Sequence, residues 1–266
     1  MTLSIITITY NNLGGLKRSV ESVLRQNYRN WELIVVDGGS TDGTKQWLRE
    51  TADTRLRYVS EPDNGIYDAQ NKGIGMARGE YCFFLNAGDV FCDNYVLETM
   101  LLGEQSDIVY GNEIVVDAQG HQVEKCQGVD KPTFLDIYMS CMKHQATFIK
   151  RTLFERFGEY DISLRIVADW EWFFRVLVYN DDITLHYRNV DVSMFENNGA
   201  SYNSPELCNK ERQQVLDRYM SKRQQEDYVF CAKYSKTRYA ERILLGSFLL
   251  KVVNWLGKRI RKRMCF

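Results

Sequence analysis

The sequence predicts an α/β protein in which a mostly parallel, Rossmann-like sheet is flanked by helices and followed by a helical C-terminal tail. Short apolar runs rich in β-branched and aromatic residues alternate with amphipathic stretches over about the first ninety residues. Two of these apolar runs are followed by an aspartate: Asp37 comes directly after Leu33 to Val36, and Asp89 comes shortly after Cys82 to Leu85. Ligands of open α/β sheets bind outside the carboxyl ends of the strands, so these aspartates predict a site for a metal-bound, hydrogen-bonded anion.

The hydrophobic periods of the first ninety residues define their elements. Alternating or continuous apolar runs predict four strands, at 3–10, 32–37, 56–60 and 81–85. Apolar residues at helical spacing predict helices at 16–26 and 66–76. The residues Ser40-Thr41-Asp42 predict the cap of another helix that begins near Gly43. We expect right-handed crossovers between the parallel strands.

The second half is less regular. A strand is expected at 108–116, followed by a hairpin turn at 117–120. Helices are expected at 134–142, 151–157 and 166–179, and from about Asn203 the chain has the pattern of highly charged helices. The predicted organisation is a nucleotide-type half at 1–110, a substrate half at 111–200 and a helical extension at 201–266.

Composition excludes several classes of function. With 266 residues, 44% of them hydrophobic, and a net charge of −1, the chain can bury a full core and has no global attraction to nucleic acid. Its seven cysteines form no C-x-x-C pair, which argues against disulfides and a zinc site and favours reduced thiols. No basic region precedes the first apolar residues, and no uncharged apolar run reaches the ~20 residues of a spanning helix. We therefore expect a cytoplasmic protein.

The C-terminal end has the pattern of a helix that lies in a membrane interface. Lys258 to Phe266 contains five Lys or Arg residues, and the tail from Ile243 to Met264, which overlaps it, is amphipathic. Its apolar stripe consists of Leu245, Leu249, Val252, Leu256, Ile260 and Met264. Anionic headgroups attract such a basic end, so we expect peripheral association with the inner face of the cell membrane. The alternative is a helix that docks on its own domain or on a second subunit.

The two strand-end aspartates are expected to do different chemistry. Asp37 precedes Gly38-Gly39, where another molecule can approach the backbone closely, and its carboxylate can accept N–H or O–H groups of a base or ribose. As an ordinary turn residue it would instead support Ser40 or Thr41. Asp89 is a candidate ligand of Mg²⁺ or Mn²⁺, which bind one or two carboxylates together with substrate phosphates; its alternative is again a turn residue.

Two further segments carry polar groups that can meet a substrate. Asp68 and Lys72 lie close to a predicted helix start near Gly65, where phosphate charge can be received, and we expect both to bind the nucleotide. The alternative is an ordinary solvated helix start. His144 and Gln145 lie between the two halves, and we expect them to contact substrate or phosphate, although a lone histidine is more often structural.

Asp169 and Glu171 lie on the predicted helix at 166–179 among tryptophan and phenylalanine residues. Residues two apart on a helix face roughly opposite ways, so at most one of the two carboxylates points into a cleft. A carboxylate beside tryptophan can have its pKa tuned for general base catalysis. The alternative is a surface ion pair with Arg165 or Arg175.

Together these segments resemble the inverting glycosyltransferases of family 2, which have the GT-A fold, over roughly residues 1–200. The run SIITITYNN is similar to the family's opening strand, which implies that Thr9, Tyr10 and Asn11 contact the nucleotide. The run ELIVVDGGSTDGT is similar to the uracil-binding strand end, which implies that Asp37 binds the base. The family's usual second acidic residue at this place is Gly38 here.

Three other motifs extend the resemblance. FFLNAGD occupies the place of the family's DxD-type metal segment, with Asn86 and Gly88 in the positions of two carboxylates, so that Asp89 is the implied metal ligand and Asn86 a nucleotide contact. HQATF and VADWEWF resemble acceptor-side motifs, which implies that Asp169 is the catalytic base. The acceptor or donor contacts implied by these motifs are His144, Gln145 and Glu171.

The resemblance implies a transferase that moves a sugar from a UDP-sugar to an acceptor hydroxyl in one inverting displacement, assisted by Mn²⁺ or Mg²⁺. The members most similar to it assemble bacterial polysaccharides, so a lipid-linked saccharide is the expected acceptor. Two alternatives stay open. A sugar-1-phosphate nucleotidyltransferase needs a Gly-rich basic loop after the first strand, represented here only by Lys17 and Arg18. A non-catalytic nucleotide-sugar binding module is favoured by the reduced metal segment.

Overall fold

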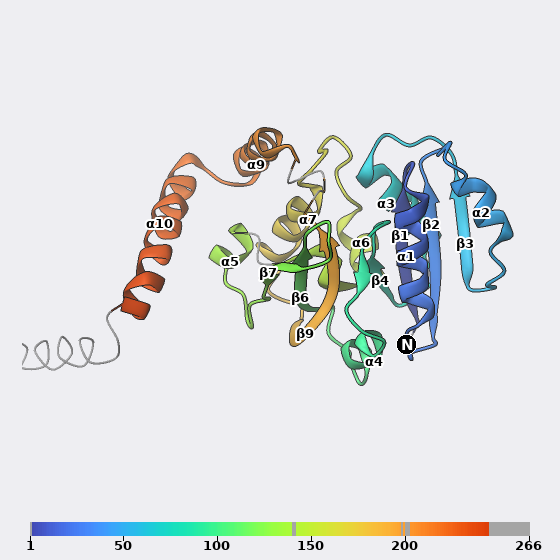
Figure 1. Ribbon diagram of the computed structural model, residues 1–266. Coiled ribbons are helices and arrows are strands. Elements are labelled where there is room, and N and C mark those ends of the chain that lie inside the picture. The colour runs from blue at the N-terminus through green and yellow to red at the C-terminus, as the bar shows by residue number, and fades with distance from the viewer. Residues whose placement is uncertain (1, 140–141, 198, 200–202, 245–266) are drawn as a thin grey trace, which may run out of the picture. The chain divides into compact units, whose positions relative to one another are not determined.

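In the computed structural model, residues 2–139, 142–197, 199 and 203–244 are described, and their strands form one mixed nine-stranded sheet (Figure 1). Along the sheet the order is β3-β2-β1-β4-β8-β6-β9-β5, and β7 pairs with β6. The strands are β1 (Leu3–Thr9), β2 (Trp31–Asp37), β3 (Leu56–Ser60), β4 (Tyr81–Phe84), β5 (Val90–Phe91), β6 (Ile108–Val116), β7 (Gln122–Cys126), β8 (Thr147–Lys150) and β9 (Leu185–Glu196).

Strands β3, β2, β1 and β4 form the parallel half that the sequence predicted. β1 pairs in parallel with both β2 and β4, and β2 pairs in parallel with β3. The register places Thr9 beside Asp37, and Asp37 beside Ser60. The carboxyl ends of these strands therefore meet at one edge of the sheet.

The rest of the sheet is mixed. β8 pairs antiparallel with β4 and β6, β9 runs parallel to β6, and β5 pairs antiparallel with β9. The predicted hairpin is confirmed as the antiparallel pair β6–β7. The sequence did not predict β5, β8 and β9. β5 has only two residues, few side chains of β9 are buried, and the place of β8 depends on pairing with β4 and β6, which are far along the chain.

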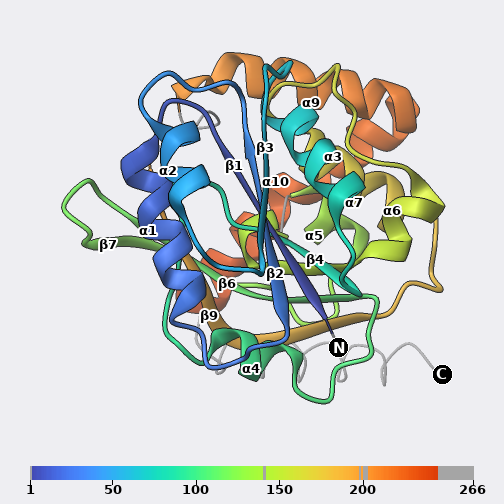
Figure 2. The same ribbon diagram turned by 90° about the vertical axis from the view of Figure 1, so that its right-hand side faces the viewer.

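Helices cover both faces of the sheet (Figure 2). One face carries α1 (Leu13–Leu24), α2 (Thr44–Glu50) and α4 (Val96–Leu101). The other carries α3 (Ile66–Met76), α6 (Arg151–Phe157) and α7 (Ala168–Leu177). α5 (Phe134–Tyr138) packs on α7 through the rings of Phe134 and Phe174. The helices predicted at 66–76 and 151–157 are confirmed with those bounds, whereas those predicted at 134–142 and 166–179 are shorter.

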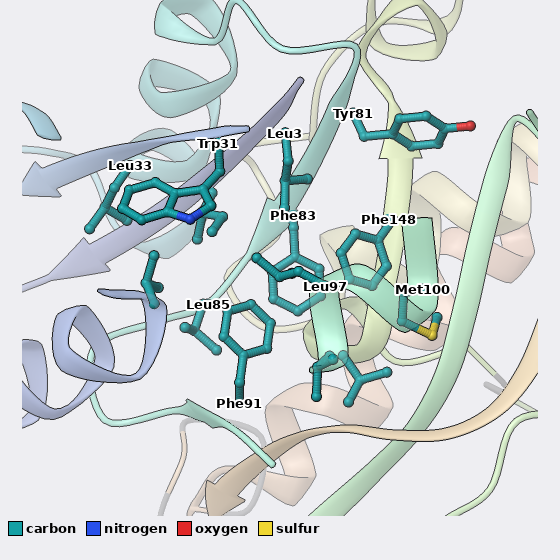
Figure 3. Close-up of a cluster of buried hydrophobic side chains, with 14 of the residues drawn as sticks. Leu3, Trp31, Leu33, Tyr81, Phe83, Leu85, Phe91, Leu97, Met100 and Phe148 are labelled. Atoms are coloured by element: carbon teal, nitrogen blue, oxygen red, sulfur yellow. The ribbon is translucent and has the colours of Figure 1, made fainter. Parts of the chain in front are cut away.

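Aromatic side chains join the two parts of the sheet on the face that α1 covers (Figure 3). Phe83 of β4 is fully buried, and its ring centroid lies 4.5 Å from that of Phe148 on β8 and 5.2 Å from that of Phe91 on β5. Burying one such side chain contributes roughly 1.5–3 kcal/mol. This packing holds β8 against the last strand of the parallel half.

On the opposite face, α3 packs closely against β1. A Cβ atom at Gly73 would lie 2.4 Å from Cγ2 of Ile6, so only glycine allows this approach. α3 follows the carboxyl end of β3. Its contact with β1 holds the first residues of α3 at the edge of the sheet where the parallel strands end. Tyr67, in the first turn of α3, is thereby directed toward the candidate site.

The chain divides into two compact units, Met1–Val215 and Leu216–Phe266. α9 (Pro205–Tyr219) spans this boundary, and α10 (Lys222–Leu244) belongs to the second unit. In the described part of the chain, no helix is both long enough and apolar enough to cross a membrane. The amphipathic stripe predicted from Leu245 to Met264 lies outside the described residues, so membrane association stays a prediction.

Glu104, which follows α4, is a buried carboxylate that joins the loop before β6 to β9. Its side chain is 4% exposed and accepts hydrogen bonds from the backbone N–H groups of Gln105 and Ser106. His186 and Arg188 of β9 contact it at 2.5 and 3.2 Å. Burial by itself raises the pKa of Glu104, but these donors favour the charged form and lower the pKa to about 2.

We expect Glu104→Gln to lower stability more at neutral pH than in acid. A carboxylate whose folded pKa lies below its unfolded value of about 4.3 stabilises the folded state above that value and loses this effect as the pH falls toward the folded pKa. The pKa difference corresponds to about 3 kcal/mol. Urea unfolding of both proteins at pH 7 and pH 3 measures the gap in unfolding free energy, which should shrink at pH 3. An equal gap at both pH values would contradict this assignment.

Candidate active site

A cavity of about 810 Å³ opens at the carboxyl edge of the parallel strands. Several residues that the sequence predicted as site residues line this cavity, and these are Thr9, Tyr10, Asn86, Asp89, His144, Gln145 and Asp169. Other predicted residues are not among those that line it, and these are Asn11, Asp37, Asp68, Lys72 and Glu171.

The strand pairing explains why distant segments meet in this cavity. β8 is antiparallel to β4, with Phe148 opposite Phe83, so β8 begins where β4 ends. The short 3-10 helix η1 (His144–Ala146) immediately precedes β8 and therefore lies beside the residues that follow β4. As a result, Nδ2 of Asn86 is 3.4 Å from Nε2 of His144.

Tyr10 and Thr9 form the part of the cavity at the end of β1. The side chain of Tyr10 is 67% exposed, whereas Thr9 is only 6% exposed. Oγ1 of Thr9 is buried and has no hydrogen-bond partner among the residues that the structure describes. An open aromatic ring and an unpaired hydroxyl are groups that a base and a ribose can satisfy by stacking and hydrogen bonding.

A carboxylate from another loop occupies the space beside Gly38. A Cβ atom at Gly38 would lie 2.5 Å from Oδ2 of Asp63 and 3.4 Å from Cδ2 of Tyr10. Asp63 lines the cavity, and its Oδ1 accepts a hydrogen bond from the backbone N–H of Gly65 at 2.9 Å. The carboxylate of Asp63, from the loop before α3, therefore lies next to position 38, where the sequence has a glycine.

Asp37 and Asn11 brace the loops next to the cavity. Asp37 is fully buried, and its oxygens accept hydrogen bonds from the backbone N–H of Ser40 at 3.1 Å and from the hydroxyl of Ser60 at 2.6 Å. Oδ1 of Asn11 accepts a hydrogen bond from the backbone N–H of Thr41 at 2.8 Å. These bonds match the turn-supporting alternative for Asp37, and contact with a nucleotide stays a prediction for both residues.

Asp68 and Lys72 hold the loop that precedes α3. Asp68 accepts a hydrogen bond from the backbone N–H of Asn64 at 2.8 Å. Lys72 donates to the carbonyl oxygen of Pro62 and pairs with Glu61, both at 3.0 Å, and the bond to Glu61 raises the pKa of Lys72. The ammonium group of Lys72 therefore bonds within this loop, and its contact with a phosphate stays a prediction.

Asp89 presents a carboxylate that fits a shared cation site. It is 9% exposed, and burial raises its pKa to about 7 against the opposing effect of His144. Among the described residues, no three His, Cys, Asp or Glu side chains are grouped to hold a metal ion by themselves. Mg²⁺ and Mn²⁺ are often bound by one carboxylate together with substrate phosphates, which is the arrangement that Asp89 fits.

Asp169 is held by two neighbouring side chains. Its Oδ2 lies 2.7 Å from Nδ1 of His144, and its Oδ1 lies 2.9 Å from the hydroxyl of Tyr67, which is also 2.6 Å from the carbonyl oxygen of Ile166. Burial raises the pKa of Asp169, but the hydrogen bond to His144 and the positive charge of the His144 ring outweigh burial and lower that pKa. Burial lowers the pKa of His144, but the same bond outweighs this effect and raises it.

The start of α7 is fixed by Glu211 of α9. Its buried carboxylate accepts hydrogen bonds from the backbone N–H groups of residues 165–167 at 2.8, 2.9 and 3.3 Å, groups that lie just before the helix. Glu171 pairs with Arg175 at 3.0 Å. Of the two carboxylates on this helix, Asp169 lines the cavity and Glu171 does not, as the helical spacing predicts.

Cationic residues of the second half also line the cavity, and sequence reasoning missed them. Lys143 and Arg212 are among the lining residues. The guanidinium carbon of Arg212 lies 4.0 Å from the ring centroid of Trp170, and Arg212 donates to the carbonyl oxygen of Tyr138 at 2.6 Å. Since Arg212 and Glu211 come after residue 200, the site includes part of the segment that the sequence assigned to the tail.

Glu113 of β6 is a further cavity residue that sequence reasoning missed. It is 2% exposed, and its Oε1 is buried without a hydrogen-bond partner in the described part of the chain. Burial raises its pKa to about 7. The available signal was a single acid inside the apolar run Ile108–Val116, a pattern that an ordinary buried strand does not have.

The sequence model of Glycosyl transferase family 2 matches residues 4–161, which is more than half of the chain. The chain belongs to glycosyltransferase family 2. It is therefore a glycosyltransferase, as the sequence resemblance implied. The matching family is one of glycosyltransferases. Its description corresponds to neither alternative that the sequence left open, the nucleotidyltransferase or the non-catalytic module.

Mycobacterial relatives of this family 2 enzyme are similar over most of their length. An uncharacterised glycosyltransferase of Mycobacterium tuberculosis is 33% identical over 193 residues, which cover 69% of this chain and 72% of the relative. A PGL/p-HBAD biosynthesis glycosyltransferase of Mycobacterium bovis is 31% identical over 208 residues, which cover 76% of this chain and 79% of the relative.

Solved structures show the fold of this family 2 enzyme. S. aureus TarS in complex with UDP-GlcNAc superposes with a TM-score of 0.61 at 17% identity, over 77% of this chain and 61% of TarS. The mannosyltransferase PcManGT from Pyrobaculum calidifontis, in complex with GDP-Man and Mn²⁺, superposes with a TM-score of 0.54 at 20% identity, over 76% of this chain and 59% of PcManGT. This chain thus spans less than two thirds of either solved chain. The GT-A fold class implied by the sequence is confirmed.

We expect Glu113→Met to stabilise the protein and Glu171→Met to destabilise it. Glu113 leaves a buried carboxyl oxygen unpaired, and an unpaired buried polar group costs about 1–3 kcal/mol. Glu171 is equally buried but pairs with Arg175, whose charge would lose its partner. Thermal unfolding should show a midpoint raised by about 2–4 °C for Glu113→Met. A lowered midpoint would mean that Glu113 has a structural role.

Proposed function

We propose that this enzyme transfers a sugar from a UDP-sugar to a hydroxyl group of a lipid-linked saccharide, with inversion at the anomeric carbon. The observation that carries the proposal is the Asp169–His144 pair, which lines the same cavity as Tyr10, Asp63 and Asp89. One cavity thereby offers a proton-accepting pair for a hydroxyl group and binding groups for a nucleotide. Bringing the two reactants together in this way is what a direct displacement requires.

The groups around Tyr10 favour a nucleotide base. An exposed ring can stack on a base, and the carboxylate of Asp63 can accept the N–H of a uracil or the O–H of a ribose. In the solved complexes, TarS holds UDP-GlcNAc and PcManGT holds GDP-Man. UDP is proposed here because residues 32–44 resemble a uracil-binding strand end.

The charges of the cavity favour a divalent cation bound together with the donor. Its lining carries the carboxylates of Asp63, Asp89, Glu113, Asp169 and Glu196 and the cations of Arg18, Lys143 and Arg212. A diphosphate adds more negative charge, and Asp89 is the residue that would hold a cation against it. Bound there, Mn²⁺ or Mg²⁺ would stabilise the charge that develops on the departing diphosphate.

The Asp169–His144 pair supplies the negative charge that lets an acceptor hydroxyl lose its proton. The acceptor oxygen attacks the anomeric carbon from the side opposite the diphosphate, so a single displacement inverts the configuration without a covalent intermediate. Glu113 and Lys143 line the cavity and are available to bind other hydroxyl groups of the acceptor. A buried carboxyl group without a partner is suited to this task because an O–H group can satisfy it.

A lipid-linked acceptor at the inner face of the cell membrane completes the proposal. The sequence supports it through the basic residues of Lys258 to Phe266 and the apolar stripe from Leu245 to Met264, which together suit an anionic lipid surface. The relative from Mycobacterium bovis is named for PGL/p-HBAD biosynthesis. The enzyme and a membrane-bound acceptor would then be held at the same lipid surface.

Calorimetric titration with UDP, GDP and CDP tests the donor. We expect UDP to bind more tightly in Mn²⁺ than in EDTA and about tenfold or more tightly than the other two. Asp89→Asn should remove most of the Mn²⁺ effect and leave metal-free binding unchanged, because only the cation loses a ligand. Asp182→Asn, at the surface and outside the cavity lining, is the matched control. Equal binding of all three nucleotides, or of none, would contradict the donor assignment.

Asp169→Asn should abolish most turnover while keeping the nucleotide bound. Release of UDP from UDP-GlcNAc or UDP-glucose, with water as acceptor, should fall by about 10²–10⁴-fold, the usual effect of a positioned proton acceptor. The affinity for UDP should stay unchanged in calorimetry, since the groups proposed for the base lie at Tyr10 and Asp63. Unchanged turnover in Asp169→Asn would remove this carboxylate from the chemistry.

A further inference from the structure

His144 differs from the other two histidines of the chain in the place of its carboxylate partner. All three histidines have Nδ1 close to a carboxylate oxygen, in the pairs His121–Asp117 at 3.3 Å, His144–Asp169 at 2.7 Å and His186–Glu104 at 2.5 Å. Of these pairs, only His144–Asp169 lines the cavity. A histidine held by a carboxylate inside a substrate cavity is in the position of a base with its orienting group.

The two ring nitrogens of His144 have different tasks. Nδ1 faces the carboxylate of Asp169, which can only accept, so Nδ1 carries a proton and donates it to this bond. Nε2 faces the amide Nδ2 of Asn86 at 3.4 Å, a longer and weaker contact in which Nε2 is the acceptor. Nε2 is therefore the nitrogen whose lone pair can take a proton from a bound hydroxyl.

The groups around His144 favour a proton on its ring. Asp169 of α7 bonds to it directly, and Glu113 of β6 and Asp89 add negative charge when they are ionised. Lys143 is the adjacent cation, and the neutral Tyr67 of α3 contacts the carboxylate of Asp169. Burial lowers the pKa of His144, but the carboxylates outweigh burial and raise it above 6.5. The same bond lowers the pKa of Asp169, so a proton shared by the pair resides on the imidazole.

We propose that His144 is a catalytic residue whose Nε2 accepts the proton of the acceptor hydroxyl, while Asp169 orients the ring and balances the charge of the imidazolium. This inference rests on the proposed glycosyl transfer. It gives the aspartate an orienting task, in place of the direct base that the family resemblance implied. A carboxylate that already accepts a hydrogen bond from an imidazole N–H is a weak base, whereas an imidazole, whose ordinary pKa is about 6.5, is well matched to this proton transfer.

The step balances in bonds and charge. The O–H bond of the acceptor breaks as its oxygen forms a bond to the anomeric carbon. The bond between that carbon and the diphosphate oxygen breaks at the same time, and its electron pair leaves with UDP. The proton moves to Nε2, so the imidazole becomes imidazolium and the His144–Asp169 pair changes from one negative charge to none.

Nitrogen-15 NMR of histidine-labelled protein tests the titration directly. Three histidines give three imidazole systems, and His144→Gln identifies the relevant one. We expect His144 to titrate above pH 6.5, and Asp169→Asn to lower its midpoint by about one pH unit or more while His121 and His186 stay unchanged. A His144 midpoint that Asp169→Asn does not move would overturn the proposal.

Release of UDP from UDP-GlcNAc or UDP-glucose, with water as acceptor, supplies the kinetic test. The ratio kcat/KM for the donor should rise with pH through the NMR midpoint of His144 in the free enzyme, since only the unprotonated Nε2 accepts a proton. His144→Gln should lower kcat by about 10²-fold or more, abolish that rise and change the donor KM by no more than about twofold. His186→Gln, the same change in a carboxylate-paired histidine outside the cavity, should alter neither the rate nor its pH dependence.

Failure of the inference and failure of the proposed function give different results. If the wild type neither binds UDP in calorimetry nor releases it from either donor, glycosyl transfer itself is wrong, and the role of His144 with it. If the wild type turns over and His144→Gln has the same rate and the same pH profile, only the role of His144 is wrong. Asp169 would then act as the base without help from the imidazole.

Discussion

The antiparallel pairing of β8 with β4 is the constraint on which the active site depends. β8 has only four residues, but its Phe148 packs on Phe83 at 4.5 Å within the buried aromatic cluster. Because the strand runs opposite to β4, the residues that precede it lie where β4 ends. His144 thereby reaches the segment of Asn86 and Asp89, although 55 or more residues separate them in sequence. A parallel β8 would place His144 at the opposite edge of the sheet.

Buried acids in this protein fall into two groups according to whether the fold provides partners for them. Glu104, Glu171 and Glu211 accept hydrogen bonds or pair with a cation, and they stabilise the elements that they join. Asp89 and Glu113 line the cavity, and burial raises the pKa of each to about 7. Buried carboxyl groups with such raised pKa values reduce the stability of the fold, but a bound ligand can supply the partners that they lack. Active sites commonly lose stability in this way in exchange for function.

The sequence predicted the parallel half well because each of its strands is visible locally, as an alternating or continuous apolar run with a turn after it. β8 and β9 were missed because their place depends on partners far along the chain. The same limit applies to side chains. Asp37 was placed correctly at a strand end, but whether its carboxylate faces a ligand or its own turn depends on Ser60 of a neighbouring strand. Glu113 and Glu211 reach the site only through the pairing of β6 and the packing of α9.

A single displacement at this cavity can be recognised from the configuration of the anomeric carbon in the product. The purified protein would be incubated with Mn²⁺, methanol as a small acceptor, and UDP-GlcNAc or UDP-glucose, whose sugars are α-linked. Proton NMR would then identify the anomer of the methyl glycoside that forms. We predict the β-anomer from the wild type and from Asp182→Asn, and almost no product from Asp169→Asn. Formation of the α-anomer by the wild type would contradict a single inverting displacement.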